Sequence, residues 1–473
     1  MLTPPSPASP SSILSRRKWL QIGGLSMGTL ASGAMPSLSR VLAADAQSKH
    51  PDRDFSVVLF WANGGPSHLD LLDLKPQAPA EYRGPFRPID TNVAGMQVSE
   101  MLPNLARLGD MIAIVRSLCH ERAEHSGGTH RFLSGYASRA ANLPDAEFPE
   151  IGSIVARQLD RAGRNVPTFV ADSKLYGGGP AYLGSSCAPF MPSPNPLTAS
   201  GNNTYDPVPI YRTANSTDNL SLTVEHARLH QRGQLLQALD RQPRTFDASG
   251  EMSSIDSFNR RAMSILTSTR TRDAFDLAQE DERTRRRYGD THWGRSLLTC
   301  RRLVEAGVRF VQCHATYRLR PETGVTSSWD DHSVNSDIFA AYREKLPVFD
   351  QAVPAFIEDL SSRGLDRDVL FIFCGEFGRT PRIAYQDASR RPGRDHWPRA
   401  MSVLLAGGGL RMGQVIGATN RKAEEPIDRI MDSNCLLATI YHRFGIATSQ
   451  SFTDTSGRPI TILPNGTPIP ELL

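Results

Sequence analysis

The chain has 473 residues, of which 39% are hydrophobic and 22% charged, and its formal net charge is +4. This composition is enough for a substantial core and indicates a globular protein. The first 46 residues carry +3 of the charge, so the remainder is close to neutral and has no electrostatic basis for binding nucleic acid or an acidic membrane.

Residues 1–46 have the parts of an export signal that is removed from the mature protein. Arg16 and Arg17 precede a weakly apolar run, and Ala44 and Ala46 form a small-x-small cleavage site. The paired arginines and the glycine-diluted apolar run are typical of a twin-arginine signal. The alternative, an N-terminal membrane anchor, requires a longer apolar run. We therefore predict twin-arginine export to the periplasm or another extracytoplasmic space, with no membrane span in the mature chain.

Short apolar runs alternate with helical patterns along the rest of the chain. The runs are typical of strands buried on both faces of a parallel sheet, and they occupy residues 55–62, 111–118, 166–172, 308–315, 368–374 and 401–409. The clearest helix spans 335–363, in which Pro347 and Pro354 predict a kink or a break. The alternation predicts an α/β fold whose sheet is covered by helices on both faces.

Residues 47–473 are predicted to form a single α/β domain with an insertion at about 173–305. The insertion begins with an irregular stretch, 173–215, that is rich in Gly, Pro, Ser and Asn. A polar, Arg-rich stretch of helical pattern follows at 219–305. Because strand-like runs resume at 308, we interpret both stretches as an insertion and not as separate domains.

Ligand-type side chains are concentrated directly after the predicted strands. They occur in "NGGPSHLD" (63–70), "CHERAEHSGGTHRFLSG" (119–135), "SWDDHSVN" (328–335) and "GEFGRTP" (375–381), whose loop continues to "GRDHWP" (393–398). Taken alone, each segment reads as a turn or a helix cap. In a parallel sheet, however, the carboxyl ends of the strands meet at the edge where ligands bind.

Carboxylates and imidazoles together are mixed oxygen and nitrogen ligands, which suit Zn, Mn or Fe better than Ca. The six cysteines contain no C-x-x-C pair, so a closed structural zinc site is not indicated. We expect the cysteines to be buried free thiols, and the sequence does not assign any disulfide pairing. The sequence therefore predicts a catalytic metal site at the carboxyl edge of the sheet.

Several motifs together resemble one known family. They are "GGPSHLDLLDLKP", "WDDH", "GEFGRTP", and "GRDHWP" followed by "SVLLAGGGL". Over most of residues 54–445 the chain resembles an exported bacterial family known as domain of unknown function 1501, which is similar in fold to the alkaline phosphatase and sulfatase superfamily. The resemblance implies an alkaline-phosphatase-like three-layer sandwich with a central, mostly parallel sheet. It also implies hydrolysis of phosphate or sulfate esters at one or two metal ions.

The resemblance implies a set of metal ligands, which are Asp330, His332, Glu376, His396, Asn63 and Asp70. At two positions the chain departs from the superfamily pattern. Phe377 stands in place of a histidine and Asn63 in place of a carboxylate, so either two metals are reduced to one or the fold persists without the chemistry. The expected cofactor is one or two divalent ions of Zn, Mn, Fe or Ca.

Guanidinium groups for binding the oxyanion are expected from Arg379, Arg394 and Arg399, since each offers a bidentate fork. Asp395 is expected to face the metal edge, either ligating directly or orienting a ligand.

The same resemblance implies a position for the nucleophile, because sulfatases carry a modified Cys or Ser shortly before a Leu-Thr-Gly-like element. In "HSGGTHRFLSG" this places His125 at the modified position with Ser126 beside it. We favour Ser126 as nucleophile with His125 assisting, and Thr129 or direct attack by His125 are the alternatives. A helix cap formed by the same residues is an equally good interpretation.

Two functions of different class follow. The first is an exported metal-dependent hydrolase whose substrate is a small-molecule or glycan ester of phosphate or sulfate. The second is a noncatalytic exported binding or assembly protein on the same fold. We favour the enzyme, because polar clusters at a sheet edge more often serve chemistry than packing. Metal content distinguishes the two, whereas the choice of phosphate or sulfate and the oligomeric state stay open.

Overall fold

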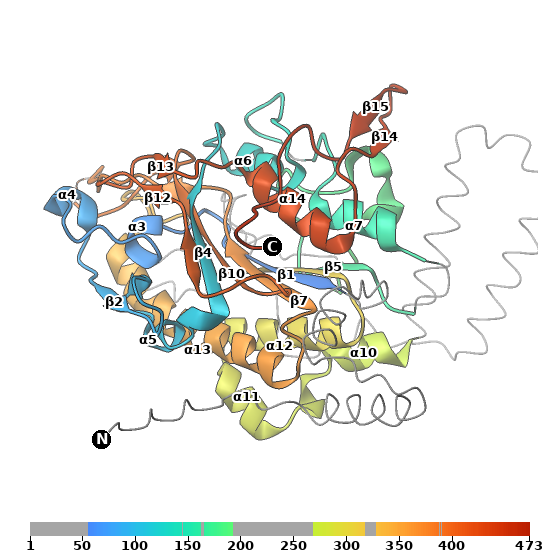
Figure 1. Cartoon of the computed structure of the whole chain (residues 1–473), viewed down its shortest axis with the longest axis horizontal. Coiled ribbons are helices and arrows are strands. Elements are labelled where there is room, and N and C mark those ends of the chain that lie inside the picture. Colours follow the sequence, from blue (N-terminus) through green and yellow to red (C-terminus); the bar gives the residue numbers. More distant parts are fainter. Residues whose placement is uncertain are drawn as a thin grey trace, which may run out of the picture. The chain divides into compact units, whose positions relative to one another are not determined.

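A seven-stranded sheet forms the centre of the structure, a computed structural model (Figure 1). Its order is β11-β4-β10-β7-β1-β6-β5. The strands are β1 (Ser56–Trp61), β4 (Ile112–Leu118), β5 (Phe169–Ala171), β6 (Phe310–His314), β7 (Val369–Cys374), β10 (Met401–Gly407) and β11 (Gln414–Ile416). All six apolar runs of the sequence form strands, and the short β11 is added at one edge.

The structure describes residues 55–143, 145–161, 165–192, 268–316, 328–386, 388 and 390–473. The predicted signal, residues 1–46, lies outside these residues, as does the middle of the predicted insertion, 193–267. The described end of that insertion, 268–305, forms α10 (Thr269–Phe275), α11 (Glu282–Tyr288) and α12 (His292–Glu305), and α12 packs directly against β6. This part of the chain therefore belongs to one of the layers that cover the sheet.

One strand of the sheet runs against the others. β1 is parallel to β6 and β7, and β5 is parallel to β6, whereas β10 is antiparallel to both β4 and β7. Because β10 is reversed, the chain that enters it lies at the edge where the parallel strands end. The loop 393–398 therefore meets the carboxyl ends of β1, β6 and β7.

Helices cover both faces of the sheet, as Figure 1 shows. One layer contains α5 (Pro103–Ala106), α10 (Thr269–Phe275), α11 (Glu282–Tyr288), α12 (His292–Glu305) and α13 (Ile338–Ser362), and the other contains α6 (His125–Ser134), α7 (Ile151–Leu159) and α14 (Ser433–Phe444). Alternate residues of β1 serve the two cores, since Val58 and Phe60 pack on the α12 and α13 side and Val57 and Leu59 on the other. The predicted three-layer α/β class, with a central, mostly parallel sheet, is confirmed.

The long helix α13 shows how the sequence sets its boundaries. The Asp337 side chain caps the start of the helix by accepting from the backbone N–H groups of Phe339 and Ala340. At the other end Gly364 has a φ of 68°, which suits a glycine after a helix. The helix continues through Pro347 and Pro354, so the predicted break is not present.

Short elements complete the described chain. Four two-stranded sheets pair β2 (Pro88–Asp90) with β3 (Gln97–Ser99), β8 (Gly378–Arg379) with β9 (His396–Trp397), β12 (Ala418–Thr419) with β13 (Pro426–Asp428), and β14 (Ser451–Thr453) with β15 (Pro459–Thr461). Short helical turns are α3 (His68–Leu71), α4 (Ala80–Arg83), η1 (Gly109–Met111), η2 (Ala181–Leu183), η3 (Ser185–Cys187) and η5 (Leu277–Gln279).

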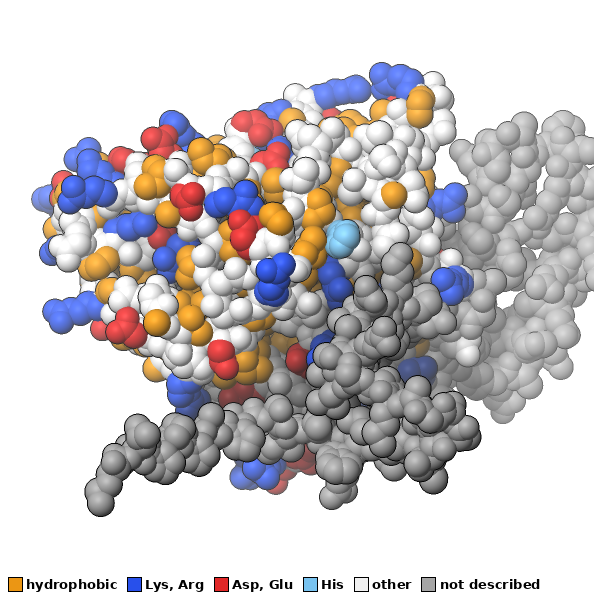
Figure 2. Space-filling view, in the orientation of Figure 1, with side chains coloured by type: hydrophobic (Ala, Val, Ile, Leu, Met, Phe, Trp, Pro, Cys, Tyr) orange, Lys and Arg blue, Asp and Glu red, His pale blue; other side chains and the backbone are white. Residues whose placement is uncertain are grey.

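Three further properties bear on the predictions. All six cysteines are free thiols. Within the described ranges, no helix combines the length and the apolar character needed to cross a membrane. On the face seen in Figure 2, basic and acidic side chains of the described residues lie interspersed.

Candidate metal centre

Five segments meet at the carboxyl edge of the sheet and bring seven polar side chains together. We call this group the Asp330 cluster. It consists of His125 at the start of α6, Asp330 and His332 after β6, Glu376 after β7, Arg379 in β8, and Asp395 and His396 at β9. β8 and β9 pair with each other, and Arg379 is directly opposite His396 in that pairing.

A glycine allows the loops after β1 and β6 to approach each other. Gly64 has a φ of 99°, and a Cβ atom at this position would lie 2.5 Å from the backbone nitrogen of Asp330. The Gly64 N–H donates to Oε1 of Glu376 at 2.8 Å, and the Trp329 N–H donates to the carbonyl of Asn63 at 2.8 Å. The ends of β1, β6 and β7 are therefore tied together around Asp330.

The Asp330 carboxylate lies at the centre of the cluster. Its Oδ1 is 2.8 Å from Nε2 of His332 and 3.0 Å from Nε2 of His396. Its Oδ2 is 3.3 Å from Nε2 of His125. Arg379 donates from Nη2 to Oδ1 at 2.6 Å. Three imidazoles therefore direct the same ring nitrogen, Nε2, toward one carboxylate.

The other nitrogen of each imidazole, Nδ1, is held by an oxygen acceptor outside the centre. These contacts join His125 to Oε1 of Glu376 at 2.6 Å, His332 to Oδ1 of Asp395 at 2.7 Å, and His396 to the carbonyl of Ala123 at 2.7 Å. Because carboxylates and carbonyls accept hydrogen bonds, each Nδ1 carries a proton. The Nε2 atoms of His332 and His396 are 3.0 Å apart and can share only one proton, so at least one lone pair faces Asp330.

The electrostatics of the cluster distinguish its members. Burial lowers the pKa of His125, but the hydrogen bonds to Asp330 and Glu376 outweigh it and raise that pKa to about 9. Burial lowers the pKa of His396 below its usual value, so its imidazole is neutral at pH 7. Burial opposes ionisation of Asp330, yet Arg379 and the surrounding imidazoles hold the pKa of this carboxyl well below its usual range.

These residues fit a transition-metal ion. Donor atoms of His125, Asp330 and His396 lie within 4.8 Å of one another, which is close enough for one ion to contact all three. Imidazole ligands whose second nitrogen donates to a carboxylate or a carbonyl are the usual arrangement in metal sites. In addition, Oε2 of Glu376 is buried and has no hydrogen-bond partner within the described chain. Three nitrogens and a carboxylate favour Zn, Mn or Fe over Ca.

Phe377 occupies the place where the superfamily pattern predicts a histidine. Its ring is buried and lies 4.4 Å from the ring of His396 and 5.4 Å from that of His125, measured between centroids. An apolar wall therefore closes one side of the cluster and provides no further ligand.

Two of the predicted ligands are placed differently from the others. Asp70 is fully buried and binds the guanidinium of Arg394, with Oδ2 at 2.8 Å from Nε, so it belongs to a separate ion pair. Asn63 borders the cluster and joins it to the β6 loop through its backbone carbonyl. Glu376 accepts a hydrogen bond from Nδ1 of His125. Asp395 accepts one from Nδ1 of His332 and so orients a histidine, which was one of the two roles expected for it.

The three predicted oxyanion-binding arginines are engaged with protein atoms. Arg379 donates from Nε to the carbonyl of Gly65 at 2.9 Å and from Nη1 to the carbonyl of Arg394 at 3.0 Å, in addition to Asp330. Arg394 is buried on Asp70. Arg399 is exposed and pairs with Glu425 at 3.2 Å. This arrangement differs from the prediction, because the two buried guanidinium groups hold the loops together.

The predicted nucleophiles lie on α6, and the structure separates them. The Ser126 hydroxyl accepts from the N–H of Leu143 at 2.8 Å and lies 3.4 Å from the carbonyl of Ala141. Thr129 is buried one helical turn after His125. Of the three candidates, His125 is the one that contacts Asp330. The Ser126 hydroxyl, which was the favoured nucleophile, therefore contacts the 141–143 segment, and His125 contacts Asp330.

Two supporting contacts were not predicted. The carbonyl of Ala123 holds His396, and Nε2 of His120 lies 2.6 Å from the backbone carbonyl of Glu376. Backbone acceptors carry no signal in a sequence. His120 does lie in one of the ligand-rich segments, which is the signal that could have identified it.

A match to a protein-family model identifies the family of this chain. The chain belongs to the family described as "Protein of unknown function (DUF1501)", whose model matches residues 54–473. This confirms the resemblance seen in the motifs. None of the curated proteins matches the chain significantly.

Similar solved structures include three proteins of low sequence identity. The PsFucS1 sulfatase from Pseudoalteromonas sp. is 10% identical, with a TM-score of 0.38, over 87% of this chain and 72% of the sulfatase. The phosphonate monoester hydrolase of Agrobacterium radiobacter is 12% identical, with a TM-score of 0.38, over 88% of this chain and 77% of that one. The C-terminal periplasmic domain of EcEptC from Escherichia coli, solved as a complex with Zn, is 10% identical, with a TM-score of 0.34, over 87% of this chain and 94% of that domain. These scores are low, so the chemistry of this chain has to be inferred from its own side chains.

Proposed function

We propose that this protein is an exported, metal-dependent hydrolase of phosphate or sulfate esters. The observation that carries the proposal is the convergence of three imidazole Nε2 atoms on the Asp330 carboxylate, with every Nδ1 anchored to an outer acceptor. The Nε2 atoms of His332 and His396 can share only one proton, so at least one of these imidazoles presents a lone pair to the centre. A divalent cation accepts their lone pairs directly.

Each member of the cluster has a definite part in this proposal. His125, Asp330, His332 and His396 would hold the ion, and Glu376 and Asp395 would orient two of the imidazoles. When bound, a divalent ion supplies Lewis-acid polarisation of the ester group. Arg379 keeps the Asp330 carboxylate ionised through its charge, and Phe377 keeps water from one side of the cluster.

A second candidate, a noncatalytic exported binding protein on the same fold, is favoured by one observation. The Ser126 hydroxyl and the Arg379 guanidinium, which would serve as nucleophile and oxyanion ligand, already bind protein groups. The two candidates therefore agree on the metal and differ on turnover.

Parallel assays with an aryl phosphate and an aryl sulfate test the enzyme proposal. We expect one of the two to be hydrolysed, with activity lost on chelation and restored by a transition-metal ion. His396→Ala should abolish turnover, whereas His442→Ala, which changes an exposed histidine on α14, should retain it. Bound metal without turnover of either ester would favour the binding protein, and a wild-type protein without metal would exclude the metal-dependent mechanism.

Export is the remaining part of the proposal, and it is supported by the paired arginines at positions 16 and 17. Changing Arg16 and Arg17 together to lysine should retain the protein in the cytoplasm, since the twin-arginine route reads this pair. Fractionation of cells that express the two forms measures the difference. Unchanged export of the lysine variant would show that the signal belongs to another route.

A further inference from the structure

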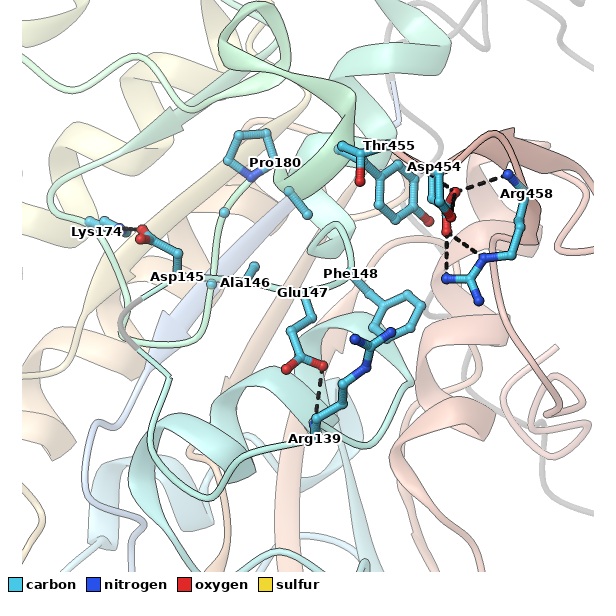
Figure 3. A pocket seen from close by; sticks show the side chains of 15 residues that line it. Arg139, Asp145, Ala146, Glu147, Phe148, Lys174, Pro180, Asp454, Thr455 and Arg458 are labelled. Atoms are coloured by element: carbon cyan, nitrogen blue, oxygen red, sulfur yellow. Dashed lines mark hydrogen bonds and ion pairs between the residues drawn. The ribbon is translucent and has the colours of Figure 1, made fainter.

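A pocket of about 680 Å³ lies beside the C-terminal half of α6 (Figure 3). Three parts of the chain line it, which are Arg139 and 145–148 after α6, Lys174 and 178–182 after β5, and 454–456 and Arg458 between β14 and β15. Its volume is within the range of small-molecule binding sites, roughly 300–1,000 Å³. None of these segments was singled out as a binding site by the sequence.

One wall of the pocket is aromatic and firmly supported. The ring of Phe148 stacks on Tyr136, with centroids 4.2 Å apart and an angle of 9°, and it meets Tyr182 edge to face at 6.4 Å. Tyr136 is anchored by its hydroxyl, which donates to the carbonyl of Thr461 at 2.8 Å. Phe148 and Tyr182 therefore present a preformed aromatic surface to the pocket.

The charged side chains around the pocket are balanced. Three basic and three acidic residues line it, which are Arg139, Lys174, Arg458, Asp145, Glu147 and Asp454. Lys174 pairs with Asp145, and Arg458 pairs with Asp454 at 2.9 Å (Figure 3). A rim without net charge does not select a strongly anionic or cationic ligand, but it offers many hydrogen-bond donors and acceptors.

The backbone also leaves room for a ligand. Gly179 has a φ of 132°, and a Cβ atom at this position would meet no described atom within 4 Å. A glycine with this conformation on an open wall lets a ligand approach the main chain closely. Any larger residue would be strained there, whatever the space.

The pocket is connected to the Asp330 cluster through α6. A Cβ atom on Gly177 would lie 2.2 Å from the carbonyl of Ser126, so the 174–182 segment packs on the first turn of this helix, next to His125. At the middle of the helix, the Phe148 ring lies 5.8 Å from the ring of His130. The helix from His125 to Ser134 is about 14 Å long. The pocket and the Asp330 cluster are therefore supported by the same helix.

We propose that this pocket binds a saccharide, and that the ester group acted on at the Asp330 cluster is carried by the same glycan. A sugar ring has an apolar C–H face that fits the aromatic wall and hydroxyl groups that fit the balanced polar rim. The assignment of the glycan as substrate rests on the proposed hydrolase function. Saccharide binding at the pocket does not, and it is measured separately.

The test uses the full-length mature protein on an array of neutral, sulfated and phosphorylated oligosaccharides, followed by calorimetric titration of the oligosaccharides retained. Tyr182→Ala should weaken binding about tenfold, since it removes an aromatic face, whereas Tyr182→Phe keeps the ring and should stay within about threefold of wild type. Tyr385→Ala is the matched control, because it removes an exposed aromatic side chain that does not line the pocket.

The outcomes separate the two proposals. Saccharide binding that depends on Tyr182 but occurs without any ester hydrolysis would support the pocket and exclude the hydrolase. Hydrolysis of simple aryl esters with no saccharide retained on the array would overturn the pocket proposal and leave the hydrolase standing. The same holds if Tyr182→Ala and Phe148→Ala both bind saccharide as the wild type does, or if the pocket captures peptides and no saccharide.

Discussion

Two carboxylate–arginine pairs at the same edge of the sheet differ in how completely the carboxylate is enclosed. Asp70 and Arg394 are both fully buried, and Arg394 satisfies its remaining donors with the carbonyls of Thr380 and Tyr82 at 3.0 and 2.8 Å. Asp330 also binds a buried guanidinium, that of Arg379, but its side chain keeps 18% exposure.

The difference lies in what surrounds each carboxylate. Asp70 accepts hydrogen bonds from the Ser67 hydroxyl and the Arg394 guanidinium, so its charge is matched and closed off from solvent. Around Asp330, three imidazoles direct their Nε2 atoms toward the carboxylate. Neutralising the charge of one carboxylate does not require three imidazoles beside the guanidinium of Arg379. The pair at Asp70 therefore holds loops together, whereas at Asp330 we propose a site for a cation.

Breaking the structural pair should have the largest effect on stability. Arg394→Met leaves the Asp70 carboxylate buried without its partner, which costs about 3–5 kcal/mol in unfolding free energy. Urea unfolding measures the loss. Arg399→Met removes an exposed arginine from its pair with Glu425 and should cost at most about 1 kcal/mol. Equal losses in the two variants would show that Arg394 is not the buried support described here.

His130 on α6 should make the stability of the fold depend on pH. Burial, followed by the charges of Arg122 and Arg131, lowers the pKa of His130 to about 4. Since the unfolded chain protonates this residue near pH 6.5, the contribution of His130 to stability is complete above pH 6.5 and is lost as the pH falls toward 4. The full loss amounts to about 3 kcal/mol.

Unfolding free energies measured between pH 7 and pH 4 check this expectation. His130→Gln has no proton to gain, so its stability should change less over this interval than that of the wild type. An identical slope in both proteins would mean that the imidazole of His130 is hydrated in the fold.

A smaller effect is expected at Ser126, and it separates a structural hydroxyl from a nucleophile. Ser126→Ala leaves the buried N–H of Leu143 without its acceptor and should cost about 1–3 kcal/mol. Hydrolysis of the responsive aryl ester should continue in the folded variant and in Thr129→Ala, and it should be lost in His125→Ala. Loss of turnover in Ser126→Ala, with the fold and the metal intact, would restore the hydroxyl as the nucleophile.

The sequence predicted the sheet well because its strands are continuous apolar runs, and each run became a buried strand. It also predicted the edge at which the site lies, since parallel strands place their carboxyl ends together. In the structure Asp330, His332 and His396, which this reasoning and the family resemblance grouped together, lie in contact with one another.

What the sequence could not provide was the direction of each side chain. Asp70 and Asp330 follow different strands with similar surroundings in the sequence, and only the packed structure shows that Arg394 closes one of them. Similarly, His125 and Ser126 are neighbours, but on a helix adjacent residues point about 100° apart. One of them faces Asp330 and the other the 141–143 segment.

Metal analysis of the purified wild-type protein and its variants tests the central claim most directly. After folding in the cytoplasm, the wild type should contain close to one transition-metal ion per chain. His125→Ala, His396→Ala and Asp330→Asn should each lose this ion, together with the stability that bound metal contributes by linkage. His130→Gln, on the same helix as His125, should keep it. A wild-type protein without metal, or unchanged metal content in all three cluster variants, would contradict the account.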